Sequence, residues 1–308
     1  MLFFFKVTFS SLALWWGLHQ VNFDQLHIVF KELPIITYSY TLLVMCLCVS
    51  LNGLRLYYIS ERIGLKISFK SLHRLTWAGT FFNQLLPSGI GGDAYRIYAL
   101  SKKNSTLLST AAIIWDRILG ISCMSLICLP MLFFINMPMP LKTITLTVYS
   151  FLMSGIIMLF LFIKFPIFQN YAFIKSLWNT LAFGKKFFSK LFSTLSITCI
   201  ASALMNFFAF YLLIIALKIP LDFWESSVLY TISLLVTLIP LSISGWGLRE
   251  SFLTAYLLAC GLPPEKGFTL GVLQGILMLI TGIIGAIFTY FLKTRKILLA
   301  LARKIDSM

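Results

Sequence analysis

The stretch Leu85-Leu86-Pro87-Ser88-Gly89-Ile90-Gly91-Gly92-Asp93-Ala94-Tyr95-Arg96 breaks an apolar helical pattern with one proline and three glycines. A second stretch in the other half of the chain reads Leu238-Ile239-Pro240-Leu241-Ser242-Ile243-Ser244-Gly245-Trp246-Gly247-Leu248-Arg249-Glu250. In both, a glycine stands at the fifth position after the proline and an arginine at the ninth. Paired interruptions in two halves of an apolar chain are the best sequence pointer to the central site of a transporter.

Composition places the chain in the membrane. Of its 308 residues, 59% are hydrophobic and 11% are charged, and the mean hydropathy is +0.92. Several apolar runs reach the length of about 20 residues that a helix needs to cross a bilayer. The net charge of +15 comes from basic residues that flank these runs, which indicates contact with anionic lipid headgroups and argues against a nucleic-acid partner. We therefore expect an all-α polytopic membrane protein.

The apolar runs predict about six spanning helices, and the two interrupted stretches predict two re-entrant helical hairpins. We expect one integral-membrane domain over residues 1–308, with a hairpin at 71–101 in the first half and another at 226–260 in the second. Each hairpin consists of two pieces that are too short to cross alone. The predicted spans cover residues 2–18, 34–59, 106–134, 143–163, 191–217 and 267–292, and the basic segment 164–190 is expected to lie on the headgroup surface.

Loop charges predict the topology. The connections after the second and fourth spans and the C-terminal tail are rich in Lys and Arg, whereas the other loops hold few. The positive-inside rule then places both termini in the cytoplasm, with the two hairpins entering from opposite faces as an inverted repeat. The N-terminal apolar run lacks a small-residue cleavage site and is expected to remain as the first span.

Charged residues lie inside or beside the predicted membrane segments. Arg96, Arg117 and Arg249 stand next to or near the carboxylates of Asp93, Asp116 and Glu250. An isolated charge there costs at least about 2.5–3.5 kcal/mol, so each group needs a partner or a wet cavity. Two interpretations stay open: internal ion pairs that lock the hairpins, or arginines that bind an anionic substrate. A further arginine near the end of the second span, Arg55, is expected to snorkel toward the headgroups.

The breaks also predict helix ends within the membrane. At Gly91, Gly92 and Gly245 a new helix would begin, and its free N–H groups favour phosphate or carboxylate. Close helix packing is an alternative role for Gly91. Asn83, just before the first break, offers a hydrogen bond to the substrate or to the protein core. Small residues four apart in the last span, at Gly271 and Gly275 and at Gly282 and Ala286, predict packing faces.

No catalytic or metal-binding pattern is present in the sequence. The three histidines (His19, His27 and His73) are scattered and are expected near the membrane interface. The six cysteines lie in apolar runs and have neither disulfide nor zinc spacing. No Walker or nucleophile-elbow sequence occurs. We expect no cofactor, no metal and no enzyme activity.

The two breaks, together with Asn83-Gln84-Leu85-Leu86-Pro87-Ser88, Asp116-Arg117 and Gly245-Trp246-Gly247-Leu248-Arg249-Glu250, resemble the lysylphosphatidylglycerol synthetase transmembrane-region family, also called flippase-like domain proteins. The resemblance covers nearly the whole chain. Asp116 stands where relatives often have Glu, and Gln274 stands in the last span where many have Arg. Because the chain stops at Met308, the resemblance implies a stand-alone member without the soluble synthase domain.

The resemblance implies a bacterial inner-membrane lipid translocase that handles an anionic phospholipid or a polyprenyl phosphate. Arg96, Arg117 and Arg249 would attract the headgroup phosphate, and the hairpins would open the site to each leaflet in turn. The alternatives are an intramembrane enzyme or accessory subunit for a lipid-linked sugar, and a secondary transporter for a small anion.

Overall fold

All the regular structure described in the computed structural model is helical. The structure describes residues 2–31, 34–85, 91–102, 104–135, 142–143, 145–150, 154–155, 194–238 and 242–305. The predicted turn at 136–140, most of the predicted fourth span, the basic segment 164–190, and the prolines Pro87 and Pro240 lie outside these ranges. The helices are α1 (Leu2–His19), α2 (Phe23–Lys31), α3 (Ile35–Ile63), α4 (Phe69–Leu85), α5 (Gly91–Ser101), α6 (Thr106–Cys128), α7 (Met131–Phe134), α11 (Thr194–Ala216), α12 (Phe223–Leu238), α13 (Leu248–Ala259) and α14 (Pro264–Ile305).

Four segments of the described chain are long and apolar enough to cross a membrane. They are Ile35–Ile63, Thr106–Phe134, Thr194–Ala216 and Pro264–Tyr290, which match four of the predicted spans. The predicted first span forms α1, an 18-residue helix that is not among the four candidates because Lys6 and several hydroxyl residues dilute its apolar character. Exposed apolar side chains such as Ile35 and Phe134 suit a surface in contact with lipid.

Both interrupted stretches consist of short helices, as predicted. In the first, α4 has 17 residues and α5 has 11; in the second, α12 has 16 and α13 has 12. At about 1.5 Å per residue they are about 26, 17, 24 and 18 Å long, less than the hydrocarbon thickness of about 30 Å. The same spacing from proline to arginine gives two different helix positions: Arg96 is the sixth residue of α5, whereas Arg249 is the second residue of α13.

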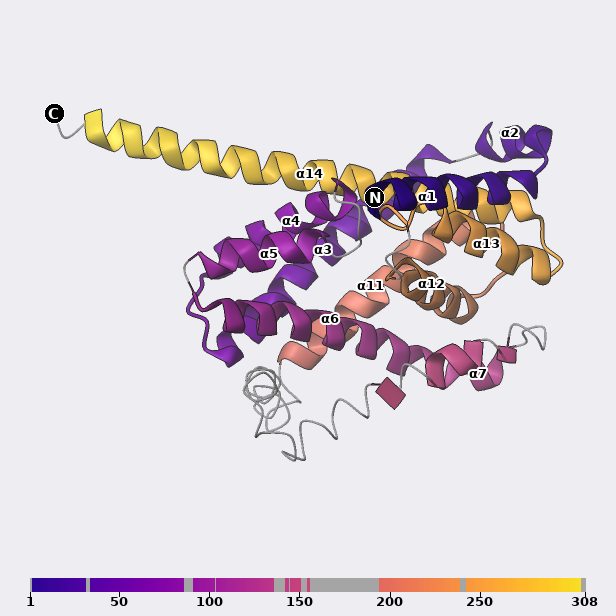
Figure 1. The fold of residues 1–308 in the computed structure, drawn as a ribbon, viewed down its shortest axis with the longest axis horizontal. Helices are drawn as coiled ribbons and strands as arrows, with labels where there is room; N and C mark the ends of the chain where they lie inside the picture. Colours follow the sequence, from indigo (N-terminus) through magenta and orange to yellow (C-terminus); the bar gives the residue numbers. More distant parts are fainter. Residues whose placement is uncertain are drawn as a thin grey trace.

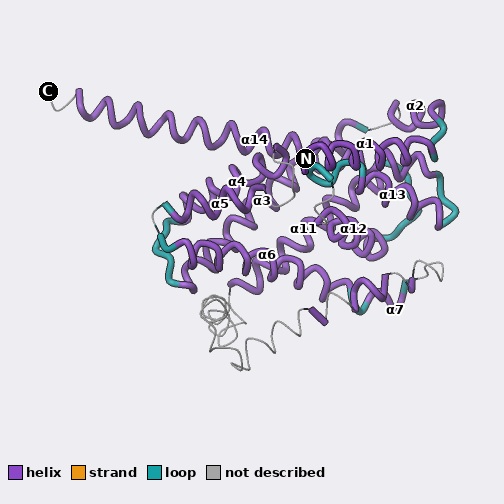
Figure 2. Tube along the Cα trace, viewed as in Figure 1, coloured by secondary structure: helices purple, strands orange, loops and turns teal. Residues whose placement is uncertain are grey.

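The last helix connects the two halves of the bundle. Figure 1 shows α14 running along one side of the molecule, past α13 and then past α4, before it continues beyond the other helices to the C-terminus. The helix starts at Pro264, whose fixed φ suits a first helical turn. The tube in Figure 2 shows the remaining helices crossing beside it, with α3 packed on α11 and on α4. Most of the buried apolar side chains form two clusters, one around Phe207, Leu229 and Leu253 and the other around Leu56, Leu72 and Trp115.

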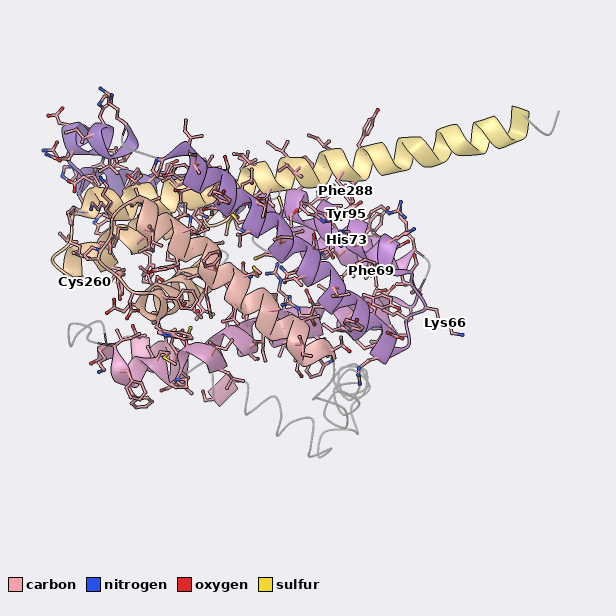
Figure 3. All side chains as sticks on the ribbon, turned by 180° about the vertical axis from the view of Figure 1, so that it is seen from behind. Lys66, Phe69, His73, Tyr95, Cys260 and Phe288 are labelled. Carbon is pink, nitrogen blue, oxygen red and sulfur yellow. The ribbon has the colours of Figure 1, made fainter. Side chains whose placement is uncertain are left out.

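An aromatic group fixes α4 against α14. The His73 ring contacts Phe69 and Phe288, and Trp77 Nε1 donates a hydrogen bond to His73 Nε2 at 3.2 Å (Figure 3). Gly53 on α3 approaches His73 from another side. His73 therefore packs between helices, near the start of α4.

Glycines on α14 allow close contact with both halves. A Cβ at Gly285 would collide with the backbone carbonyl oxygen of Trp77 on α4, and a Cβ at Gly271 would lie 2.8 Å from the Cα of Glu250 on α13. Gly282 is less crowded, because its nearest neighbour would be the Cα of Phe81 at 3.3 Å. Of the predicted small-residue positions, Gly271 makes such a close approach of backbone to backbone, whereas Gly285, which was not in the predicted pattern, makes the tightest one.

We predict that Gly285→Ala lowers the free energy of unfolding by about 1–3 kcal/mol, the usual cost of overpacking, because a backbone carbonyl cannot move aside as a flexible side chain can. Thermal unfolding in detergent micelles measures the change. Gly282→Ala is the matched control on the same helix and should be close to neutral, since alanine also favours the helix. Equal losses in the two variants would contradict this packing.

Candidate functional site

The first break forms a shared ion pair centred on Asp93. Arg96 Nη1 donates to Asp93 Oδ1 at 3.2 Å, and Arg117 Nε donates to Asp93 Oδ2 at 2.5 Å. Asp93 and Arg96 lie three residues apart on α5, whereas Arg117 comes from α6. A second donor of Arg96, Nη2, binds the Thr76 carbonyl oxygen on α4 at 3.2 Å. Asp93 therefore holds two arginines and connects α5 to α6.

A second ion pair lies beside it. Arg55 Nε donates to Asp116 Oδ1 at 2.7 Å, and Arg55 Nη1 donates to the hydroxyl of Ser202 on α11 at 3.2 Å. Both charged side chains are buried. The prediction that Arg55 snorkels is wrong: it lies eight residues before Ile63, the last residue of α3, or about 12 Å along the axis, which is too far from the helix end.

These five residues form one charge cluster. Arg55, Asp93, Arg96, Asp116 and Arg117 come from α3, α5 and α6, and three cations against two anions leave the cluster with one excess positive charge. The side chain of Arg117 is 34% exposed, whereas those of the other four are below 10%. Arg117 is therefore the member of the cluster that an outside group reaches most easily.

The second break carries a more enclosed pair. Arg249 Nη2 donates to Glu250 Oε1 at 2.6 Å, and Arg249 Nε donates to the Gly271 carbonyl oxygen on α14 at 3.0 Å. The guanidinium also stacks 5.3 Å from the Trp246 ring centre. A Cβ at Gly275 would collide with this guanidinium, so the absence of a side chain there makes room for it.

At or beside the start of each new helix, one backbone N–H group donates a hydrogen bond to a side chain of the protein. The backbone N–H of Gly92 donates to Asn83 Oδ1 at 2.7 Å, and that of Gly247 donates to Glu250 Oε2 at 2.6 Å. The expectation that these ends are open to an anion does not hold for these two groups. Gly91 is the first residue of α5 and is buried.

Gly245 and Ser244 of the second break both have backbone conformations with positive φ, and Ser244 also contacts the first half. Gly245 has φ +82°, and a Cβ there would lie 2.8 Å from the Thr237 side chain. Ser244, with φ +52°, donates its hydroxyl to the Asn83 carbonyl oxygen at 2.6 Å. A serine in this region is uncommon and strained, so the contact between the two breaks is stabilising enough to maintain it.

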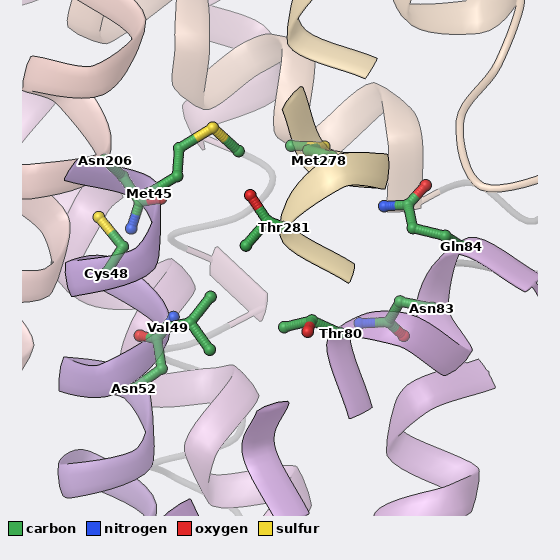
Figure 4. Close-up of a pocket in the computed structure, with 10 residues that line it drawn as sticks. All are labelled: Met45, Cys48, Val49, Asn52, Thr80, Asn83, Gln84, Asn206, Met278 and Thr281. Atoms are coloured by element: carbon green, nitrogen blue, oxygen red, sulfur yellow. The ribbon is translucent and has the colours of Figure 1, made fainter. Parts of the chain in front are cut away.

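A cavity lined by apolar and uncharged polar side chains lies between the two halves. Its volume is about 170 Å³, and α3, α4, α11 and α14 contribute its walls (Figure 4). Among the described residues that line it, none is charged and six carry amide or hydroxyl groups. The lining comprises Met45, Cys48, Val49, Asn52, Thr80, Asn83, Gln84, Asn206, Met278 and Thr281.

The cavity lies between the two charged groups. On one side, Asn52 is three residues from Arg55 on α3, and Asn206 Nδ2 donates to the Ser202 carbonyl oxygen one turn along α11. On the other side, Arg249 Nη1 is 3.7 Å from the Met278 sulfur. One helical turn thus separates the lining from the Arg55 pair, whereas Arg249 contacts the lining residue Met278 directly.

The family model for the lysylphosphatidylglycerol synthase transmembrane region matches residues 3–286. The chain belongs to this family. It is therefore a multi-pass membrane protein of a family related to lipid handling. No curated protein and no solved structure matches the chain.

The structure of this family member brings some predicted site residues together and separates others. Asp93, Arg96, Asp116 and Arg117 belong to the charge cluster, with Asn83 and Gly92 at its edge, whereas Arg249 and Glu250 lie on the far side of the cavity. Gly245 lies beside Ser244, where the second break contacts the first half. Sequence reasoning missed Arg55 and most of the cavity lining. Isolated Asn, Gln and Thr residues in apolar helices are ambiguous in sequence, although the depth of Arg55 within its helix was a usable signal.

We predict that Arg55→Met lowers the free energy of unfolding by about 3–5 kcal/mol, because it leaves the Asp116 carboxylate buried without its cation. Adding Asp116→Leu should recover most of the loss, since the double variant buries neither charge. Ser202→Ala removes only the uncharged partner of Arg55 and should cost about 1 kcal/mol. Unfolding in detergent checks all three; a double variant no more stable than Arg55→Met would refute the pair.

Proposed function

We propose that this protein moves an anionic lipid, a phospholipid or a polyprenyl phosphate, between the leaflets of the bacterial plasma membrane. The observation that carries the proposal is the cavity between the two halves of the chain, with amide and hydroxyl groups in its lining and arginines on both sides. A lipid headgroup that crosses a bilayer needs such a hydrated, polar passage, because desolvating it in hydrocarbon is costly. Discontinuous helices beside a central site are typical of proteins that alternate access between two faces.

Arg117 is the proposed first contact of the phosphate. It is half-buried, it belongs to a cluster with excess positive charge, and a guanidinium binds phosphate oxygens through two parallel hydrogen bonds. A phosphate at Arg117 would compete with Asp93, which Arg96 also holds. Arg117 would then pair with the lipid phosphate in place of Asp93, and Asp93 would stay paired with Arg96.

Arg96 and Arg249 are proposed to act later. Each is buried against a carboxylate, Asp93 or Glu250, and would reach a phosphate only when its hairpin moves. Asp116 maintains Arg55 beside the cluster, while Asn83, Gly91, Gly92 and Gly245 shape the two breaks. In this proposal the hairpins enter from opposite faces within a single domain, and both termini are cytoplasmic.

We predict that Arg117→Gln slows translocation of fluorescent phosphatidylglycerol in proteoliposomes by about 10-fold or more. The loss of one charge-assisted hydrogen bond, about 1.5–3 kcal/mol, corresponds to at least this factor. Folding should survive, because Asp93 retains Arg96. Quenching of outer-leaflet fluorescence over time measures the rate.

Arg74→Gln is the matched control for this experiment. It removes the same charge from α4, where Arg74 Nε donates to the Lys70 carbonyl oxygen near the start of the helix, far from the break. Its rate should stay within about twofold of the unmodified protein, as expected of a surface charge. An Arg117→Gln rate equal to that of Arg74→Gln would count against the proposed phosphate contact.

The proposed topology makes a separate prediction. In a variant without the six native cysteines, Lys218→Cys should react with a membrane-impermeant maleimide on intact cells, whereas Lys102→Cys should react only after permeabilisation. The reason is that basic connections are retained on the cytoplasmic side. The reverse pattern would overturn the orientation and leave the fold unaffected.

A further inference from the structure

The central cavity suits a neutral, hydrogen-bonding group. Its volume of about 170 Å³ is similar to that of a cavity known to hold one six-membered ring, about 150 Å³. That reference cavity is apolar and stays dry, whereas this one presents the amides of Asn52 and Gln84; the Asn206 amide and the Asn83 side-chain carbonyl oxygen already have partners within the protein. Leaving such groups without partners would cost about 1–3 kcal/mol each. The occupant must therefore form hydrogen bonds.

A buried amide without a partner adjoins this cavity. Gln274 is 6% exposed, and its Oε1 accepts no hydrogen bond within the part of the chain that the structure describes. It lines a smaller cavity of about 30 Å³, which shares Met45, Asn206 and Met278 with the larger one. A native protein rarely buries an unsatisfied carbonyl oxygen, so this atom indicates a missing hydrogen-bond donor.

The hydrogen-bond inventory of the lining selects hydroxyl groups. The hydroxyls of Thr80 and Thr281 donate to carbonyl oxygens of their own helix, so they face the cavity as acceptors. Gln274 Oε1, in the adjoining smaller cavity, is another acceptor, and the amides of Asn52 and Gln84 offer both donors and acceptors. A phosphate group can only accept hydrogen bonds and would leave these acceptors without donors. A hydroxyl both donates and accepts, which matches the mixture.

We propose that the cavity binds a neutral, polyhydroxylated ring that forms part of the lipid headgroup. This inference rests on the proposed function, because it divides one headgroup between two sites: the phosphate near Arg117 and the ring among the amides. The geometry allows this division. Asn52 lies about one helical turn from Arg55, a member of the charge cluster. Thr80 lies about one turn from Thr76, whose carbonyl oxygen accepts a hydrogen bond from Arg96.

The test measures binding of two soluble short-chain lipids to the purified protein in detergent. Dioctanoyl phosphatidylinositol carries a polyhydroxylated ring, and dioctanoyl phosphatidylmethanol carries the same phosphodiester charge with no hydroxyl. We expect phosphatidylinositol to bind about 10-fold more tightly. Gln274→Met should reduce this ratio to about 3 or less without changing the affinity for phosphatidylmethanol. The thermal stability of the empty protein should not fall, because methionine removes an unsatisfied oxygen at constant length.

Two further variants make the result decisive. Asn52→Leu removes an amide that lines the larger cavity itself and should also reduce the ratio, so the test does not depend on one variant folding. Gln25→Met, on the exposed helix α2, is the matched control and should keep the 10-fold ratio.

Each outcome decides between the two proposals. Equal binding of both lipids to the unmodified protein would overturn the ring site but leave the anionic-lipid function standing. A ratio preserved in both cavity variants would place the ring elsewhere and also overturn the inference. Failure of both lipids to bind would instead count against the proposed function itself.

Discussion

The fold depends on the pairing of buried charges. Asp93 binds two arginines, and Asp116 binds a third, so α3, α5 and α6 meet at a single point inside an apolar bundle. Bonds from the same arginines to Ser202 and to the Thr76 carbonyl extend this group to α11 and α4. In a medium of low dielectric constant, separating any of these pairs is far more costly than in water. The cluster therefore sets the relative positions of five helices.

The two halves of the chain differ in how they satisfy this constraint. At the first break the charges come from three helices, and one guanidinium stays partly exposed. At the second break, Arg249 and its neighbour Glu250 are consecutive, and the arginine is covered by Trp246 and α14. Equal spacing in sequence has thus produced unequal environments, because α5 begins five residues before its arginine and α13 only one.

The sequence was sufficient to predict those features that depend on local pattern. Long apolar runs identified the spans described by the structure, and proline with glycine identified the short helices on either side of each break. Arg55 and Gln274 show why the remainder was not predictable. The partner of Arg55 lies 61 positions away, and the surroundings of the Gln274 oxygen are set by residues of three other helices. Such contacts arise from the packing of distant segments, which leaves no periodic signal in the chain.

The glycine faces of α14 determine which movements can occur between the two halves. Gly271 meets α13 and Gly285 meets α4, each at the distance where backbones touch. Specific contacts beside these points oppose sliding: Arg249 Nε donates to the Gly271 carbonyl oxygen, and Phe288 packs on His73 and Trp77 of α4. Rotation is opposed as well, because it would bring bulky side chains such as Leu273 and Leu277, now buried, into the same narrow gaps. α14 is therefore a rigid connection through which a displacement of one hairpin would be transmitted to the other.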